Sequence, residues 1–219
     1  MLEIEFWSDL QCPWSHVAAI RLRRALTQFE SPARVHWRYW PLELVNRSAP
    51  SRCTIETERP VLAQLEPDAF APWTRMDYPD SFLAAMTMLK CAGLQSPEAA
   101  DRFDTILRYA FFRDTCNLAR VDVLLHLAEQ AGVDVPRLGA DYWGGRGAAL
   151  LWQDWQESHQ RAIQGSPHLF ALGTDCHVHN PGITSHDSVH GIPIIDSDDP
   201  AFIGRWLREA AAAAPSPSP

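Results

Sequence analysis

Lysine is almost absent from this chain, and no stretch of it concentrates positive charge. Lys90 is the only lysine among 219 residues, and the formal net charge is -8 at pH 7. Binding to nucleic acid and to anionic membrane surfaces both depend on clustered Lys and Arg side chains. The composition therefore predicts neither kind of partner.

The chain also lacks the patterns of secreted, membrane-spanning and disulfide-stapled proteins. Glu3 and Glu5 stand where a secretory signal carries basic residues, and no apolar run approaches the roughly 20 residues of a membrane span. The five cysteines include no CxxC pair and no repeated spacing, which argues against a disulfide framework and against a structural zinc motif. We therefore expect a cytoplasmic protein with reduced thiols.

Periodicity at the N-terminus predicts a strand, a helix and a second strand. Apolar residues at positions 2, 4 and 6 alternate with acids, which indicates a strand ending near Ser8-Asp9. Pro13 suits a first helical turn, and helical spacing then continues to about residue 29. Alternation returns over residues 35–39 and stops at Pro41. Such a βαβ unit has parallel strands.

The middle of the chain reads as a helical block. Residues 46–80 are rich in Pro, Ser and acids and predict a loop with short helical turns, whereas residues 81–163 predict helices, the last from about 146 to 163. Trp152, Trp155 and His159 recur at helical spacing, which is typical of core packing.

The last third predicts further strands and a closing helix. Apolar runs at 168–172 and 191–196 read as strands, the second at a sheet edge because it contains Pro193. A stripe over 202–210 predicts a helix, and residues 215–219 predict a disordered tail. The element order predicts an α/β fold: a small mixed sheet with helices on its faces, interrupted by a helical insertion.

A cysteine stands at the first predicted strand-to-helix junction. Unpaired backbone N–H groups and the helix dipole favour negative charge at a helix N-terminus, so we expect the pKa of Cys12 to be lowered. Ser15, three residues later, is expected to direct its hydroxyl at the same sulfur. Cys12 is thus the candidate nucleophile and Ser15 its hydrogen-bond donor.

The segment Cys12-Pro13-Trp14-Ser15 resembles the CPxC active-site motif of the DsbA-like thioredoxin family, with serine in place of the second cysteine. The sequence WRYWPLE at 37–43 resembles the FrnE-like branch of dithiol-disulfide isomerases. Ser166-Pro167 matches the family's loop whose proline is cis and faces the active-site cysteine.

This resemblance spans nearly the whole chain. It implies a thioredoxin-like domain formed by residues 1–45 and 164–214, with a loop and helical insertion over 46–163. It also implies that Pro13, Trp14, Ser166 and Pro167 bind substrate, since an extended substrate can pair with exposed backbone beside the thiol. The expected partner is a disulfide-containing protein or a small-molecule thiol or disulfide, and no tightly bound cofactor is expected.

Ser15 departs from the family pattern in a way that changes the expected chemistry. A dithiol enzyme clears its mixed disulfide by attack from the second thiol. We therefore expect a monothiol thiol-disulfide oxidoreductase or isomerase, whose Cys12 is released by glutathione or another low-molecular-weight thiol as co-substrate. Cys176 should lie some 15–25 Å along a strand from the site. Nothing in the sequence brings Cys53 or Cys116 to it.

Two other functions fit the same residues. Kappa-class glutathione transferases and 2-hydroxychromene-2-carboxylate isomerases carry a Ser-Pro-x-Ser version of the motif, and a protein that has lost turnover could still bind peptides. The His-rich stretch from Cys176 to His190 could supply metal ligands, but its Asn-Pro-Gly turn favours a solvated loop, and no metal site is predicted. His16 is expected to be exposed and to point away from Cys12.

Overall fold

The computed structural model describes residues 1–214 and confirms the N-terminal βαβ unit. It consists of β1 (Leu2–Ser8), α1 (Pro13–Thr27) and β2 (Ala33–Tyr39). The two strands are parallel, in register from Leu2 opposite Ala33 to Ser8 opposite Tyr39. The predicted tail at 215–219 lies outside the described residues.

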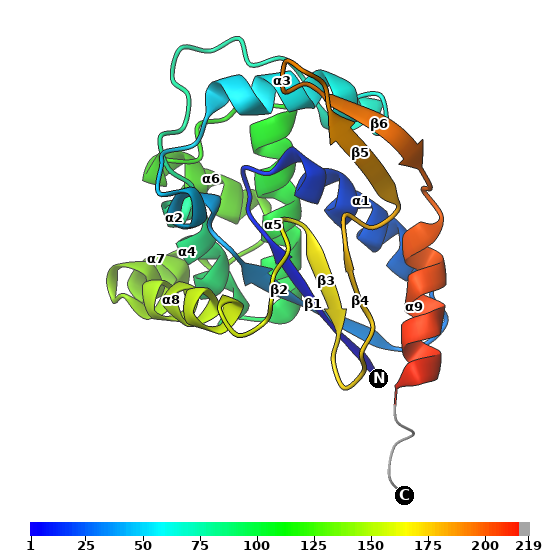
Figure 1. The fold of residues 1–219 in the computed structure, drawn as a ribbon. Helices are drawn as coiled ribbons and strands as arrows, with labels where there is room; N and C mark the ends of the chain where they lie inside the picture. The colour runs from blue at the N-terminus through cyan, green and yellow to red at the C-terminus, as the bar shows by residue number, and fades with distance from the viewer. Residues whose placement is uncertain (215–219) are drawn as a thin grey trace, which may run out of the picture.

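A four-stranded mixed sheet forms the centre of the molecule, in the order β2-β1-β3-β4. β3 (His168–Ala171) pairs antiparallel with β1, and β4 (His177–His179) pairs antiparallel with β3. The closing helix α9 (Phe202–Ala213) packs against α1, whereas the helices within residues 83–158 lie on the side of β2 (Figure 1). The prediction of a mixed sheet with an inserted helical block is confirmed.

Every element between β2 and β3 is helical. The elements are α2 (Leu42–Asn46), α3 (Arg52–Leu62), the 3-10 turn η1 (Pro67–Ala69), α4 (Leu83–Gly93), α5 (Pro97–Phe112), α6 (Val121–Gln130), α7 (Val135–Trp143) and α8 (Arg146–Ser158).

Two boundaries in this block differ from the prediction. The segment predicted as a loop contains the three-turn helix α3, whose first turn is capped by Ser51 and which tolerates Pro60 near its end. The last helix stops at Ser158 rather than near residue 163, and Ala162 beyond it adopts a left-handed backbone with φ 49°.

The C-terminal part holds two strands that the sequence did not predict. β4 has three residues, and β5 (Ile183–Asp187) has a single apolar side chain, so neither shows the alternation of a strand with one buried face. The predicted strand at 191–196 exists as β6 (Pro193–Asp198), but it pairs with β5 in a separate hairpin instead of joining the main sheet.

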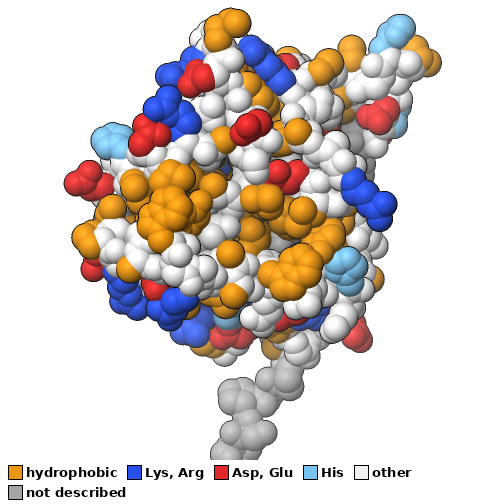
Figure 2. All heavy atoms as spheres, turned by 90° about the vertical axis from the view of Figure 1, so that its left-hand side faces the viewer, with side chains coloured by type: hydrophobic (Ala, Val, Ile, Leu, Met, Phe, Trp, Pro, Cys, Tyr) orange, Lys and Arg blue, Asp and Glu red, His pale blue; other side chains and the backbone are white. Residues whose placement is uncertain are grey.

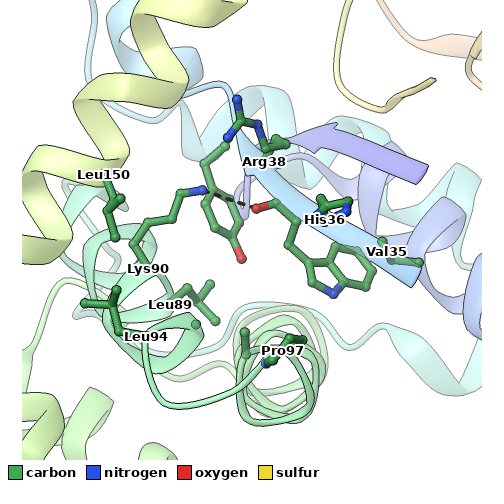
Figure 3. Close-up of a pocket in the computed structure, with 12 residues that line it drawn as sticks. Val35, His36, Arg38, Leu89, Lys90, Leu94, Pro97 and Leu150 are labelled. Atoms are coloured by element: carbon green, nitrogen blue, oxygen red, sulfur yellow. Dashed lines mark hydrogen bonds between the residues drawn. The ribbon is translucent and has the colours of Figure 1, made fainter. Parts of the chain in front are cut away.

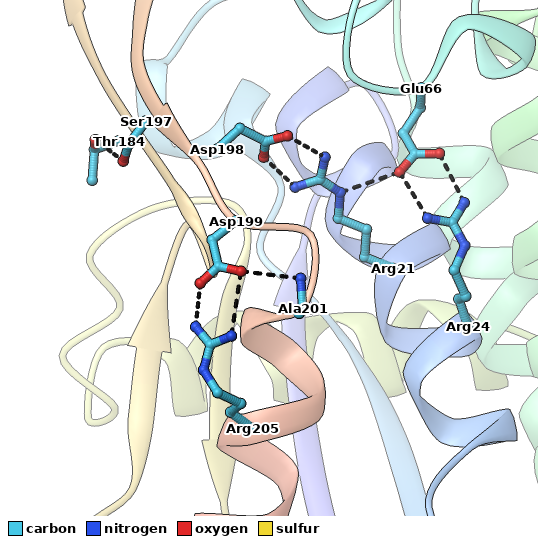
Figure 4. A network of polar contacts seen from close by, with 9 residues as sticks. All are labelled: Arg21, Arg24, Glu66, Thr184, Ser197, Asp198, Asp199, Ala201 and Arg205. Carbon is cyan, nitrogen blue, oxygen red and sulfur yellow. Dashed lines mark hydrogen bonds and ion pairs between the residues drawn. The ribbon is translucent and has the colours of Figure 1, made fainter.

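A buried arginine fastens this hairpin to α1. Arg21, whose side chain is 2% exposed, donates Nη1 and Nη2 to the two carboxylate oxygens of Asp198 at 2.6 and 3.0 Å. Its Nε donates to Glu66 at 3.1 Å, and Arg24 holds the same carboxylate from outside (Figure 4). Because β6 also packs on α3, the hairpin and α3 lie together beside α1 (Figure 1).

The outer face of α7 and α8 exposes aromatic side chains. Figure 2 shows apolar groups gathered on the side of the molecule that carries these helices. Trp143 is 73% exposed and Trp152 is 55% exposed, so the prediction that Trp152 packs in the core is wrong. The helical spacing of Trp152, Trp155 and His159 misled the prediction because α8 buries a different side, which includes Leu151 and Asp154. In residues 1–214, no helix combines the length and apolarity required to cross a membrane.

Candidate functional site

Two loops that are distant in the sequence meet at Cys12. Cys12 is the N-cap of α1, directly before Pro13, and only 6% of Cys12 is exposed to solvent. The Cys12 thiol donates to the carbonyl oxygen of Ser166 at 3.0 Å, and the Ser166–Pro167 peptide bond is cis. The Ser166 hydroxyl in turn accepts from the backbone N–H of Asp9 at 2.9 Å. The structure thus brings the motif and the Ser166-Pro167 loop together.

The expectation of a lowered pKa at Cys12 is wrong for this conformation. Burial raises the pKa of the thiol to about 11, and the negative charge of Glu58 acts in the same direction. The Ser166 hydroxyl and the backbone N–H of Ser15 oppose this rise without cancelling it. A helix N-terminus favours the thiolate only if the sulfur stays hydrated or meets a cation, and here the surrounding chain excludes water.

The hydroxyl of Ser15 does not donate to the Cys12 sulfur, which corrects the role predicted for it. Its oxygen lies 2.8 Å from the carbonyl oxygens of both Asp9 and Cys12, and it accepts a hydrogen bond from Arg108 at 2.9 Å. A hydroxyl has one proton to donate, and that proton is committed to these carbonyls. Ser15 therefore fixes the backbone of the turn rather than the thiolate.

Two carboxyl groups near the thiol were not identified from the sequence. Asp9 is fully buried and accepts from the backbone N–H groups of Gln11 and Leu42 at 2.7 and 2.6 Å, and burial raises its pKa to about 6. On α3, burial raises the pKa of Glu58 to about 7, against a hydrogen bond from the Trp14 side chain. Asp9 stands at the end of a predicted strand, which is a weak sequence signal for a site residue. Glu58 lies in a predicted loop, where no sequence signal points to the site.

His16 is buried, so the prediction that it is exposed is wrong. Its ring is stacked on Phe112 at 4.7 Å between centroids, and its Nε2 lies 3.1 Å from the carbonyl oxygen of Ala69. Burial lowers its pKa to about 3, so the ring is neutral near pH 7 and is a poor proton carrier there. The helical insertion covers this side of α1, which the sequence pattern of α1 alone could not reveal.

The other cysteines do not join the motif. All five are free, and Cys91 is fully buried in α4. Cys53 precedes Glu58 by five residues on α3, which turns it about 140° around the helix axis. Cys176 lies in the β3–β4 turn, where its carbonyl accepts from Ala171 at the end of β3 remote from Pro167.

The histidines of the β3–β4 hairpin bind one another. His168 Nε2 lies 3.0 Å from Nδ1 of His177, and burial lowers the pKa of His168 to about 4. Across the described part of the chain, no group of three or more His, Cys, Asp or Glu side chains is arranged to hold a metal ion.

A pocket of about 240 Å³ lies away from the thiol, between β2 and helices α4, α5 and α8 (Figure 3). Lys90 crosses it, donates to the Trp37 carbonyl at 3.3 Å and forms an ion pair with Asp154. Asp154 also accepts from the backbone N–H of Tyr39 at 2.9 Å. These contacts satisfy outward-facing backbone groups of the edge strand β2, and none of the lining residues belongs to the Cys12 motif.

Comparison with known proteins identifies the family. The family model described as the DSBA-like thioredoxin domain matches residues 3–190. The chain belongs to this family. The resemblance noted in the sequence is therefore confirmed at the level of the DsbA-like family. No curated protein sequence matches the chain.

Solved structures share the fold of this DsbA-like protein at low sequence identity. A Nitrosomonas europaea protein assigned as a disulfide isomerase has 15% identity and a TM-score of 0.69, covering 95% of this chain and 98% of that one. The cytosolic disulfide reductase DsbM of Pseudomonas aeruginosa has 13% identity and a TM-score of 0.64, covering 97% and 100%; another of its structures contains glutathione. A 2-hydroxychromene-2-carboxylate isomerase has 12% identity and a TM-score of 0.58, covering 77% and 84%.

Proposed function

We propose that this DsbA-like protein is a cytoplasmic thiol-disulfide reductase or isomerase of the FrnE-like branch, with Cys12 as its one catalytic thiol. One observation carries the proposal: the Cys12 sulfur lies at the N-terminus of α1 against Ser166, and a hydroxyl occupies the position of the family's second thiol. The mixed disulfide formed at Cys12 is then released by glutathione or another small thiol.

The reaction proceeds by two exchanges. The Cys12 sulfur forms a bond to one sulfur of the substrate, the substrate S–S bond breaks, and the departing sulfur leaves as a thiol with the proton that Cys12 gave up. A small thiol then attacks the substrate sulfur of the mixed disulfide, which restores the Cys12 thiol and joins the small thiol to the substrate. A second small thiol completes net reduction and leaves as part of a symmetrical disulfide, so the two electrons come from the small thiols.

The raised pKa of Cys12 favours reduction and isomerisation over oxidation. A strongly oxidising DsbA-type centre depends on a stabilised reduced form. Cys12 lacks that stabilisation, because burial disfavours its thiolate.

Substrate binding is assigned to the groups around the sulfur. Pro13 and Trp14 follow Cys12 directly, and Trp14 is partly exposed. Ser166 and Pro167 supply backbone with which an extended peptide could pair. A cytoplasmic location agrees with five free cysteines and with the fold shared with the cytosolic reductase DsbM, whose glutathione-containing structure supports glutathione as co-substrate here.

The test is glutathione-coupled reduction of 2-hydroxyethyl disulfide by the full chain. We expect activity in the wild-type protein and in Cys53→Ser, which removes an exposed cysteine, and loss of activity in Cys12→Ser. Mass spectrometry of the stalled reaction should find the 2-mercaptoethanol half of the substrate in a mixed disulfide with Cys12. Undiminished activity in Cys12→Ser would exclude the proposed mechanism.

A glutathione-dependent isomerase or transferase is the second candidate. It is favoured by Ser15 at the second motif position and by the likeness to 2-hydroxychromene-2-carboxylate isomerase. In that case a bound glutathione supplies the thiolate while Cys12 stays protonated, as its raised pKa allows. Conjugation or isomerisation that survives Cys12→Ser would support this alternative. If the wild-type chain and Cys12→Ser both bind peptide and neither turns over substrate, the chain is a non-catalytic binding protein.

A further inference from the structure

Arg108 comes from the helical insertion but ends beneath the active-site turn. It lies on α5 with its side chain 1% exposed. Its Nη1 donates to the Ser15 hydroxyl at 2.9 Å and its Nη2 to the Ser8 hydroxyl at 2.8 Å. Ser8 is the last residue of β1 and Ser15 lies in the first turn of α1. One guanidinium therefore holds both ends of the loop that carries Cys12.

A buried carboxylate orients this guanidinium. Asp104, one turn earlier on α5 and fully buried, accepts from Arg108 Nε at 2.8 Å and from Arg23 Nη2 at 2.7 Å. Burial would raise the pKa of Asp104, but the two arginines outweigh burial and keep it below its ordinary value. The carboxylate is thus ionised, and Arg108 is held by a charged partner on its own helix.

The position of Arg108 decides how the Ser15 hydroxyl can be used. Because Arg108 donates to the Ser15 oxygen, the hydroxyl proton must point elsewhere, and the carbonyl oxygens of Cys12 and Asp9 receive it at 2.8 Å. A hydroxyl that accepts from a cation is also a stronger donor. The Ser15 hydroxyl therefore holds the carbonyl of Cys12, while the Cys12 thiol donates to the carbonyl oxygen of Ser166. A cysteine at position 15 would be a weaker acceptor for Arg108.

We propose that Arg108 is a positioning residue for Cys12, acting through Ser15. Its contact keeps the first turn of α1 in the geometry that buries the sulfur against Ser166. The proposal rests on the proposed role of Cys12 as nucleophile, and it gives the helical insertion a part in the site. It also accounts for a hydroxyl at position 15, because an oxygen meets the demand of the buried guanidinium.

The test measures the pH midpoint of Cys12 alkylation by iodoacetamide, site by site with mass spectrometry. We compare the wild type with Ser15→Ala, Arg108→Met and the double variant. Loosening the turn should hydrate the sulfur, so each single variant should lower the midpoint by about one pH unit. Because both residues act through one contact, the double variant should shift the midpoint no further than either single variant.

Arg21→Met is the matched control. Arg21 is also buried, on α1, and also holds two carboxylates, but it does not touch the active-site turn. It should lower the urea midpoint of unfolding and leave the alkylation midpoint of Cys12 unchanged. An equal shift in Arg21→Met, or shifts that add in the double variant, would overturn the proposal.

Ser15→Ala decides the question if Arg108→Met does not fold, because it removes one oxygen and leaves the Arg108–Asp104 pair in place. An unchanged midpoint in that variant would overturn the proposal. Alkylation requires no enzymatic substrate, so a chain without disulfide-reducing activity would count against the proposed function and leave this result standing.

Discussion

The ionisation of Cys12 gives the sharpest test of the site. Its pKa rises from an ordinary value of 9.0 to about 11, chiefly through burial. This rise corresponds to about 3 kcal/mol against the thiolate in the folded chain. At pH 7 about one molecule in ten thousand then carries the thiolate, against about one in a hundred for an ordinary thiol. Alkylation of Cys12 should therefore increase about tenfold per pH unit from pH 7 to pH 10 without levelling off.

The assay is pulsed labelling with iodoacetamide at a series of pH values, followed by a second isotopic label after denaturation. The shape of the profile reports the pKa, whereas steric protection changes only its height. The same thiol in the urea-unfolded chain is the control and should level off about two pH units lower. A plateau below pH 8 in the folded chain would refute the argument that burial dominates, and would restore the helix N-terminus as the controlling influence.

Three further outcomes follow from individual side chains. Glu58→Gln should lower the alkylation midpoint of Cys12, because it removes the negative charge that opposes ionisation of the thiol. Burial lowers the pKa of His16 to about 3, so in mild acid the unfolded chain binds more protons than the folded chain. The free energy of unfolding, measured by urea titration, should therefore fall as the pH drops below about 6.5, and it should fall less steeply in His16→Gln. A Cβ at Gly147 would lie 2.4 Å from a backbone oxygen, so Gly147→Ala should cost about 1–3 kcal/mol by the same method.

Matched substitutions control these predictions. Glu56→Gln is the control for Glu58→Gln. Glu56 also lies on α3, but its carboxylate pairs with Arg59, so the substitution should leave the alkylation midpoint of Cys12 unchanged. A Cβ at Gly139, inside α7, would meet no atom within 4 Å, so Gly139→Ala should stabilise the chain by about 0.5–1 kcal/mol. Equal effects at Gly139 and Gly147 would show that close packing at α8 is not the cause.

Local patterns were enough for the first half of the sheet domain and for the position of the thiol. Alternation over Leu2–Phe6, Pro13 at a first helical turn and Ser166-Pro167 before an apolar run all correspond to elements of the fold. Each is a signal that the chain carries within a few residues. The hairpin strands β4 and β5 were missed because polar side chains line them, so no alternation distinguishes them from a loop.

The environment of the thiol could not be read in the same way. The raised pKa of Cys12, the burial of His16 and the use made of the Ser15 hydroxyl all depend on chain that is distant in the sequence. Glu58 and Arg108 reach the site from α3 and α5, and no sequence pattern around either residue predicts that its side chain lies near Cys12. A motif gives the reactive atom, whereas the packing of the insertion decides its protonation.

The ion-pair network under the active-site turn also bears on how this protein could be shortened or recombined. A miniature made by joining β2 directly to β3 would keep the four strands of the sheet, but it would lose Arg108 and with it the partner of two buried hydroxyls, Ser8 and Ser15. Ser15 would keep its hydrogen bonds to the carbonyls of Asp9 and Cys12, whereas a Ser8 hydroxyl left buried without a partner costs about 1–3 kcal/mol. Grafting the Cys12 motif onto another scaffold meets the same requirement, so a transplanted loop needs α5 or an equivalent buried donor to keep its shape.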